Sequence, residues 1–156
     1  GKGLGGGIFP LAALLVREDL DLVGDRALGH YTHEKSSVGC AAALATIKCL
    51  FEEGLIARSA RLGQKGLQYL SDMQTKYPLI HEVRGLGLFF GIELRKYGKP
   101  ASQLADKMMY HSLSNGLSYK VGGGCVLTLC PPLTITEQEL FRAFEIIEQG
   151  LQEMIY

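Results

Sequence analysis

LIHEVRGLGLFFGIEL, residues 79–94, is the stretch that decides how this 156-residue chain folds. β-branched and aromatic residues on both sides of a glycine-rich centre are typical of strands. The glycines at positions 85 and 87 favour a bend or bulge, because glycine adopts backbone angles that other residues avoid. The sequence therefore predicts two β segments with a bend between them.

Helical patterns precede this stretch. Residues 55–77 carry apolar residues at helical spacing with basic residues between them, and Pro78 ends that helix. An alanine-rich helix is predicted over residues 38–53, with Ser36 or Ser37 as its N-cap and Gly54 at its end. The longer helix is suited to connect two lobes.

Further elements follow it. A helix over residues 101–114 ends at Asn115-Gly116, a left-handed C-cap, and strands at 119–121 and 126–130 flank a glycine turn. Thr136 and Glu139 have the spacing of a capping box that opens a last helix. That helix carries an apolar stripe suited to core packing, formed by Leu140, Phe144, Ile147, Leu151 and Ile155.

The beginning of the chain is different in character. Residues 8–17 are predicted to form a buried strand, and residues 29–37 a polar loop. Residues 1–53 then resemble the end of an α/β lobe, and residues 54–156 a linker helix with a compact α+β lobe. Five of the first seven residues are glycine and no initiator methionine is present, so we expect this chain to be part of a longer one.

Composition excludes several classes of partner and site. Sixteen basic and sixteen acidic residues cancel, with no basic face, so we expect neither nucleic acid nor a membrane as a partner. No apolar run approaches the ~18 residues that span a bilayer. The four cysteines and four histidines lack metal-ligand spacing, so we expect no metal site. Scattered cysteines without a secretory signal favour reduced, buried thiols in a cytoplasmic protein.

Lys2 is the first candidate for chemistry. It lies in GKGLGGGIFPLAA, residues 1–13, where small neighbours leave room for a planar group or a phosphate. A primary amine in such a place can form an imine with an aldehyde cofactor. The alternative is a solvated lysine, which is the commoner state of this residue.

Two further residues are candidates for binding anions. Thr32 precedes the alanine-rich helix, where a hydroxyl and free N–H groups can hold a phosphate; the alternative is a threonine that caps its own turn. Arg84 stands beside Gly85, where a guanidinium can bind a carboxylate through two hydrogen bonds. The alternative for Arg84 is a structural salt bridge to Glu82 or Glu93.

Four segments in order resemble the class III aminotransferases, a fold-type I family that depends on pyridoxal 5′-phosphate (PLP). They are residues 1–13 around Lys2, Thr32 through Ala43, Val83 through Leu94 with its R-G-x-G-L motif, and PPLTIT at residues 131–136 before the last helix. The resemblance covers essentially the whole chain. One departure is Lys35-Ser36-Ser37, where the family usually has Gly-Asn-Pro after the threonine.

The resemblance implies a fold and a set of roles. Residues 1–53 would be the C-terminal part of the large cofactor-binding α/β domain. Residues 54–156 would be the linker helix and the small C-terminal α+β domain with an antiparallel sheet. Lys2 would be the Schiff-base lysine and proton carrier, Thr32 would hold the cofactor phosphate, reaching into the partner's site of a homodimer, and Arg84 would bind the substrate carboxylate.

The implied activity is transfer of an amino group from an amino acid or amine donor to a 2-oxo acid. A PLP-dependent decarboxylase or aminomutase of the same family is the alternative. The family's acidic partner for the pyridine nitrogen, its ring over the cofactor and its first phosphate loop precede the lysine and are not in this sequence. We therefore expect a C-terminal fragment that is inactive and without cofactor when isolated, or a non-catalytic folding or dimerisation module.

Overall fold

A computed structural model describes residues 3–26, 29 and 36–154, which form two compact units divided between Gly54 and Leu55. Unit 1 precedes this division and unit 2 follows it. In unit 1 a glycine turn near Gly5 leads to a short 3-10 helix, η1 (Glu18–Leu20), and later to helix α1 (Ser37–Glu52). The predicted N-cap is confirmed, because the Ser36 hydroxyl accepts the N–H of Gly39 at 3.4 Å.

The strand predicted over residues 8–17 is wrong. Residues 10–17 form no regular structure, and the side chains of Ile8, Leu14 and Leu15 are exposed. A buried strand requires hydrogen-bonded neighbours, and none of the strands in the described part of the chain pairs with this segment. The prediction rested on the apolar composition of residues 8–17, which does not show whether a neighbouring strand is present.

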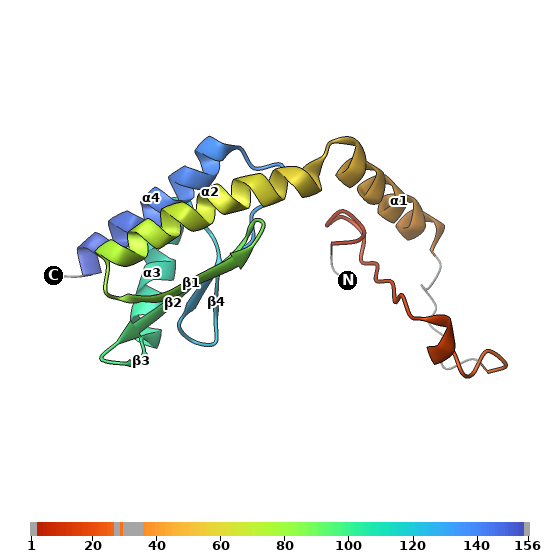
Figure 1. Ribbon diagram of the computed structural model, residues 1–156, viewed down its shortest axis with the longest axis horizontal. Coiled ribbons are helices and arrows are strands. Elements are labelled where there is room, and N and C mark those ends of the chain that lie inside the picture. Colours follow the sequence, from red (N-terminus) through yellow and green to blue (C-terminus); the bar gives the residue numbers. More distant parts are fainter. Residues whose placement is uncertain (1–2, 27–28, 30–35, 155–156) are drawn as a thin grey trace. The chain divides into compact units, whose positions relative to one another are not determined.

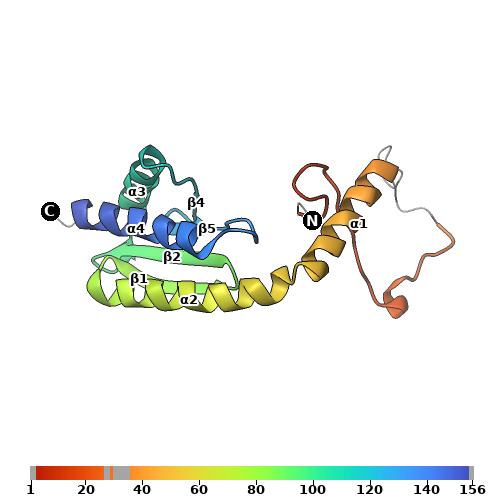
Figure 2. The same cartoon turned by 90° about the horizontal axis from the view of Figure 1, so that it is seen from above.

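Unit 2 contains an antiparallel sheet, in which Figure 1 labels β1, β2 and β4 and Figure 2 labels β5. The strand order of the sheet is β1-β2-β5-β4. Its strands are β1 (Ile80–Leu86), β2 (Phe89–Lys96), β4 (Lys120–Gly122) and β5 (Val126–Leu129). A two-residue strand, β3 (Lys99–Pro100), was not predicted and pairs with β2 across a turn at Tyr97-Gly98. The bend predicted between the two β segments of residues 79–94 is the β1–β2 turn, where Gly87 has φ +55°.

Three helices pack on one face of this sheet: α2 (Leu55–Lys76), α3 (Ser102–Ser114) and α4 (Glu137–Met154). Helices α2 and α4 lie side by side in both views (Figures 1 and 2). The core between helices and sheet is fully buried and includes Phe90, Ile92 and Leu94 from β2. Phe90 meets Phe144 of α4 edge to face, with ring centroids 5.6 Å apart.

Glycine lets α2 approach the β1–β2 hairpin closely. A Cβ atom added at Gly63 would lie 2.2 Å from the carbonyl oxygen of Gly87, and one at Gly66 would lie 2.7 Å from the Phe90 ring. The N–H of Leu88 donates to the Ser59 hydroxyl at 3.2 Å, so a side chain of α2 also holds the turn. The backbone of Gly87 at Gly63, the Phe90 ring at Gly66 and the Ser59 hydroxyl therefore all join the helix to the hairpin.

The last helix is held at its start and along its length. The Glu139 N–H donates to the Thr136 hydroxyl at 3.1 Å and the Thr136 N–H donates to the Glu139 carboxylate at 2.8 Å, which confirms the capping box. The predicted stripe is buried from Leu140 to Leu151, and Ile155 lies outside the described residues. The hydroxyls of Tyr69 and Tyr77 on the α2 side both donate to Glu148 of α4.

The cysteine prediction is only partly confirmed. All four thiols are free, as expected for reduced cysteines. Only Cys125 is buried, whereas Cys40 and Cys130 are exposed.

Within the described ranges, no helix is both long enough and apolar enough to cross a membrane.

We predict that Gly63→Ala lowers the free energy of unfolding by about 2 kcal/mol, because the added methyl group overlaps the Gly87 carbonyl. This loss should occur although alanine favours an isolated helix by about 1 kcal/mol. Gln64→Ala, on the exposed side of the same helix, is the control and should change stability by less than about 0.5 kcal/mol. Urea unfolding measures both. A neutral or stabilising Gly63→Ala would contradict the close contact.

Candidate functional site

Arg84 lies on the sheet face opposite the helices. Strand residues alternate between faces, so the buried residues of β2 leave Gly91, Glu93 and Arg95 on this open face. Arg84 pairs across the strands with Gly91, and Gly91 pairs with Thr128 of β5. These three residues therefore form one row across the sheet, with the residue that lacks a side chain in the middle.

A groove of about 380 Å³ lies over this row of residues. Arg84 and Thr128 supply its polar side chains, and Gly91 leaves the space between them. The remaining lining residues are apolar or glycine: Gly85, Leu86, Phe89, Phe90 and Val126. A Cβ added at Gly91 would lie 3.4 Å from Val126 and 3.6 Å from the Arg84 side chain, which are ordinary contact distances, so a side chain there would occupy part of the groove.

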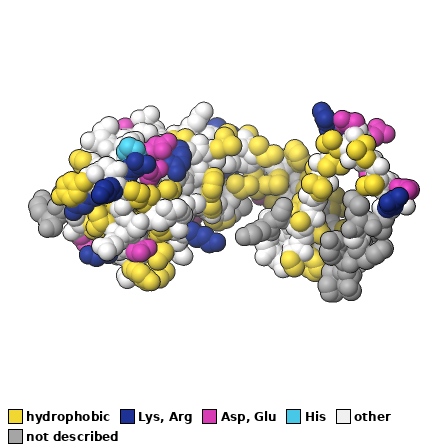
Figure 3. Space-filling model, turned by 90° about the horizontal axis from the view of Figure 1, so that it is seen from below, with side chains coloured by type: hydrophobic (Ala, Val, Ile, Leu, Met, Phe, Trp, Pro, Cys, Tyr) yellow, Lys and Arg dark blue, Asp and Glu magenta, His cyan; other side chains and the backbone are white. Residues whose placement is uncertain are grey.

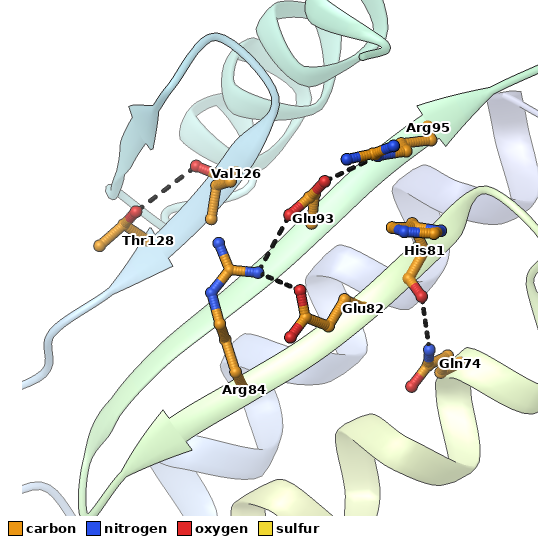
Figure 4. Close-up of polar contacts among 8 residues, drawn as sticks. All are labelled: Gln74, His81, Glu82, Arg84, Glu93, Arg95, Val126 and Thr128. Atoms are coloured by element: carbon orange, nitrogen blue, oxygen red, sulfur yellow. Dashed lines mark hydrogen bonds and ion pairs between the residues drawn. The ribbon is translucent and has the colours of Figure 1, made fainter. Parts of the chain in front are cut away.

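Arg84 pairs with both carboxylates that the sequence suggested as structural partners (Figure 4). Its Nη1 donates to Glu82 at 2.7 Å and to Glu93 at 3.0 Å. Glu93 also accepts from the Nε of Arg95 at 2.8 Å. Positive and negative side chains lie next to one another on this unit in the space-filling view (Figure 3). The four residues Glu82, Arg84, Glu93 and Arg95 form what we call the charge ladder, and their charges cancel.

The ladder shifts the pKa values of two of its members, Glu93 and Arg84. Hydrogen bonds from Arg95 and then from Arg84 hold the pKa of Glu93 below its ordinary value, so the carboxylate stays charged. The pKa of Arg84 is raised, chiefly by its hydrogen bond to Glu93. The guanidinium therefore remains a permanent cation.

One edge of the Arg84 guanidinium stays available. Both carboxylates bind the same nitrogen, Nη1, and no acceptor in the described part of the chain bonds to Nε or Nη2. A planar guanidinium can present Nε–H and one Nη2–H in parallel to the two oxygens of a carboxylate. The Nη2 end points toward the strand that carries Val126 and Thr128 (Figure 4). The ion pairs and a bound carboxylate can therefore use different edges of one side chain.

Lys2 and Thr32 lie outside the described residues, and so does most of the loop predicted at 29–37. Their described neighbours in unit 1 do meet. The Phe9 ring packs on Gly39 in the first turn of α1, where an added Cβ would lie 2.7 Å from the ring. A Cβ at Gly6 would lie 2.9 Å from the hydroxyl of Thr46, farther along α1. The segment that follows Lys2 thus packs along the helix that follows Thr32.

Sequence reasoning missed Gly91, Arg95 and Thr128. Alternation along β2 could have placed Gly91 and Arg95 on the face of Glu93, because residues 90, 92 and 94 are apolar. The position of Thr128 depends on the pairing of β5 with β2, which no local pattern contains. Among the described residues no group of histidine, cysteine or acidic side chains could hold a metal ion.

We predict a stability loss in acid that depends on Glu93. Because its pKa is lowered in the folded state, its stabilising effect is present above the ordinary value of 4.5 and is lost as pH falls through the lowered pKa. Urea unfolding from neutral pH to about pH 3 should show a steeper loss for the wild type than for Glu93→Gln. Arg95→Gln removes the main cause of the lowering and should also flatten the curve. Equal slopes for all three proteins would contradict the ladder.

The sequence of this chain is similar to that of a known protein family and of several curated proteins. The family described as "Aminotransferase class-III" matches residues 1–151. The (R)-1-hydroxy-2-aminoethylphosphonate ammonia-lyase of Vibrio splendidus (strain 12B01) is 38% identical over 99% of this chain and 33% of that protein. An ornithine aminotransferase of Bacillus cereus (strain Q1) is 35% identical over 97% of this chain and 36% of its own length.

Solved structures of aminotransferases are also similar to this chain. The acetylornithine aminotransferase of Elizabethkingia anophelis superimposes with a TM-score of 0.88 at 31% identity, covering 98% of this chain and 38% of that one. The chain spans about a third of the length of the curated relatives it matches. The predicted fold class is confirmed, since these neighbours are aminotransferases of the PLP-transferase fold. The chain belongs to the class III aminotransferase family, whose members depend on pyridoxal 5′-phosphate.

Proposed function

We propose that this chain is part of a longer PLP-dependent aminotransferase that moves an amino group from an amino acid or amine donor to a 2-oxo acid. The observation that carries the proposal is the family match over residues 1–151, which includes the Lys2 segment, the Thr32 segment and the Arg84 motif in order. The ornithine and acetylornithine aminotransferases among its relatives support the same reaction class.

The candidate residues fit such a cofactor in their chemistry. Lys2 supplies an amine for the cofactor aldehyde, and Thr32 supplies a hydroxyl for the phosphate near the start of α1. The packing of Phe9 on Gly39 supports a common site for their two segments. When bound, PLP accepts the electron pair released at the substrate α-carbon. In this proposal Lys2 carries the proton between that carbon and C4′ of the cofactor.

Arg84 binds the substrate carboxylate in this proposal. Its open Nε–Nη2 edge and the groove over Gly91 support that role. Glu82 and Glu93 already neutralise its charge in part, so the carboxylate gains mainly from the two directed hydrogen bonds.

We further propose that residues 1–53 form the end of the large domain and residues 54–156 the linker helix and small domain of a cytoplasmic homodimer. Exposed apolar side chains on α1, including Leu44, Ile47 and Phe51, support contact with protein beyond this chain. The isolated chain is then inactive, because the residues that complete the cofactor site belong elsewhere in the enzyme.

Elimination of ammonia is a second candidate function. The relative with 38% identity over 99% of the chain is named as an ammonia-lyase that acts on an aminophosphonate. Arg84 could hold a phosphonate through the same edge, because its oxygens also accept paired hydrogen bonds. Incubating the full-length enzyme with that compound separates the two functions: a lyase releases ammonia without an oxo acid, whereas an aminotransferase requires one.

We predict that Lys2→Ala in the full-length enzyme abolishes amino transfer and the absorbance band of lysine-bound cofactor, because no other amine replaces the missing one. Lys48→Ala, at an exposed position on α1, is the matched control and should retain both. Absorbance spectra and single-turnover assays measure the effect. A variant at Lys2 that kept the wild-type spectrum would refute its assignment.

We predict that Arg84→Gln raises KM for a carboxylate-bearing substrate by about 10- to 100-fold, since hydrogen bonds to charged groups contribute about 1.5–3 kcal/mol. The same substrate without its carboxylate should react almost equally with both enzymes. Arg142→Gln, which removes an exposed arginine of α4, is the control. An equal rise in KM for both substrates would show that Arg84 has a structural role and does not bind the carboxylate.

A further inference from the structure

Arg84 has a long side chain on an edge strand, so its orientation has to come from its neighbours. Strand β1 ends the sheet order, and the Arg84 side chain remains about half exposed. A free arginine samples many rotamers, and fixing one opposes binding through lost entropy. A carboxylate therefore binds better to a guanidinium that is already fixed in position.

The two partners of Arg84 differ in how firmly they are held. Glu93 lies on the inner strand β2, its side chain is 13% exposed, and its second oxygen accepts from Arg95. Glu82 lies on the edge strand itself, its side chain is 53% exposed, and no second partner holds it among the described residues. Glu93 is thus the anchored acceptor and Glu82 the loose one.

The position of the anchor fixes which edge faces the groove. Arg84 passes over Gly91, with its Nε 3.7 Å from the place where a Cβ of residue 91 would stand. Glu93 takes Nη1 from one side, and the Nη2 end then faces the strand of Val126 and Thr128 (Figure 4). Because the guanidinium is planar, fixing Nη1 and the aliphatic stem also fixes Nε and Nη2.

We propose that Glu93 is the positioning residue of the site: it holds Arg84 through Nη1 so that the Nε–Nη2 edge stays aimed at the groove and receives a carboxylate. This inference rests on the carboxylate-binding role proposed for Arg84. Arg95 supports it by holding the other oxygen of Glu93. Glu82 adds charge balance without setting the orientation.

Side-chain NMR of the full-length enzyme tests the proposal directly. Arginine labelled with ¹⁵N gives an Nε–H signal for Arg84, identified by its loss in Arg84→Lys. Titration with propionate, a plain carboxylate, should shift this signal in the wild type. Glu93→Gln should weaken the apparent affinity for propionate about tenfold, since one charged hydrogen bond no longer fixes the guanidinium. Glu82→Gln is the matched control and should weaken it less than about twofold.

The outcomes separate the two proposals. If the Arg84 Nε–H signal of the wild type does not shift with propionate, carboxylate binding by Arg84 is refuted. The positioning role of Glu93 is then refuted as well. A wild-type response that Glu93→Gln leaves unchanged, or that Glu82→Gln weakens as much, refutes only the positioning role. If Glu93→Gln does not fold, Arg95→Gln replaces it, because it frees the anchored oxygen while keeping Glu93. An unchanged affinity in that variant also overturns the proposal.

Discussion

The contact between α2 and the β1–β2 hairpin is the constraint on which unit 2 depends. Gly63 lies against the Gly87 carbonyl, Gly66 leaves room for the Phe90 ring, and Ser59 accepts from the turn. A larger residue at Gly63 would have to move the Gly87 backbone, and one at Gly66 would have to displace the buried Phe90 ring. This contact presses one face of the hairpin onto the helices. The opposite face, with Arg84 and Glu93, is thereby left to carry the groove.

The same constraint explains the R-G-x-G-L motif in physical terms. Gly87 adopts a left-handed conformation and meets Ser59, and Gly85 leaves room for the backbone of Phe89, where an added Cβ would lie 2.6 Å from its carbonyl oxygen. The arginine before these glycines is therefore held at a fixed place beside a tight turn. Its ion pairs with Glu82 and Glu93 balance its charge there.

Local patterns were enough to predict most helices and strands of unit 2, because caps, breakers and periodicity lie within a few residues of one another. The capping box at Thr136 and the bend at Gly87 are examples. The strand at residues 8–17 was mispredicted because a strand also needs neighbours. Gly63 and Thr128 escaped notice for a related reason, since their partners are distant in sequence. The candidate site could therefore be predicted only in part: Arg84 and its two carboxylate partners, but not the groove.

We propose that Lys2 carries the cofactor of a class III aminotransferase. Borohydride reduction of the full-length enzyme, followed by peptide mass spectrometry, tests it most directly, because reduction makes an imine between lysine and cofactor permanent. We expect a phosphopyridoxyl group on the peptide that contains Lys2. A modified lysine elsewhere with an unmodified Lys2, or a cofactor-saturated protein with no modified lysine, would contradict it.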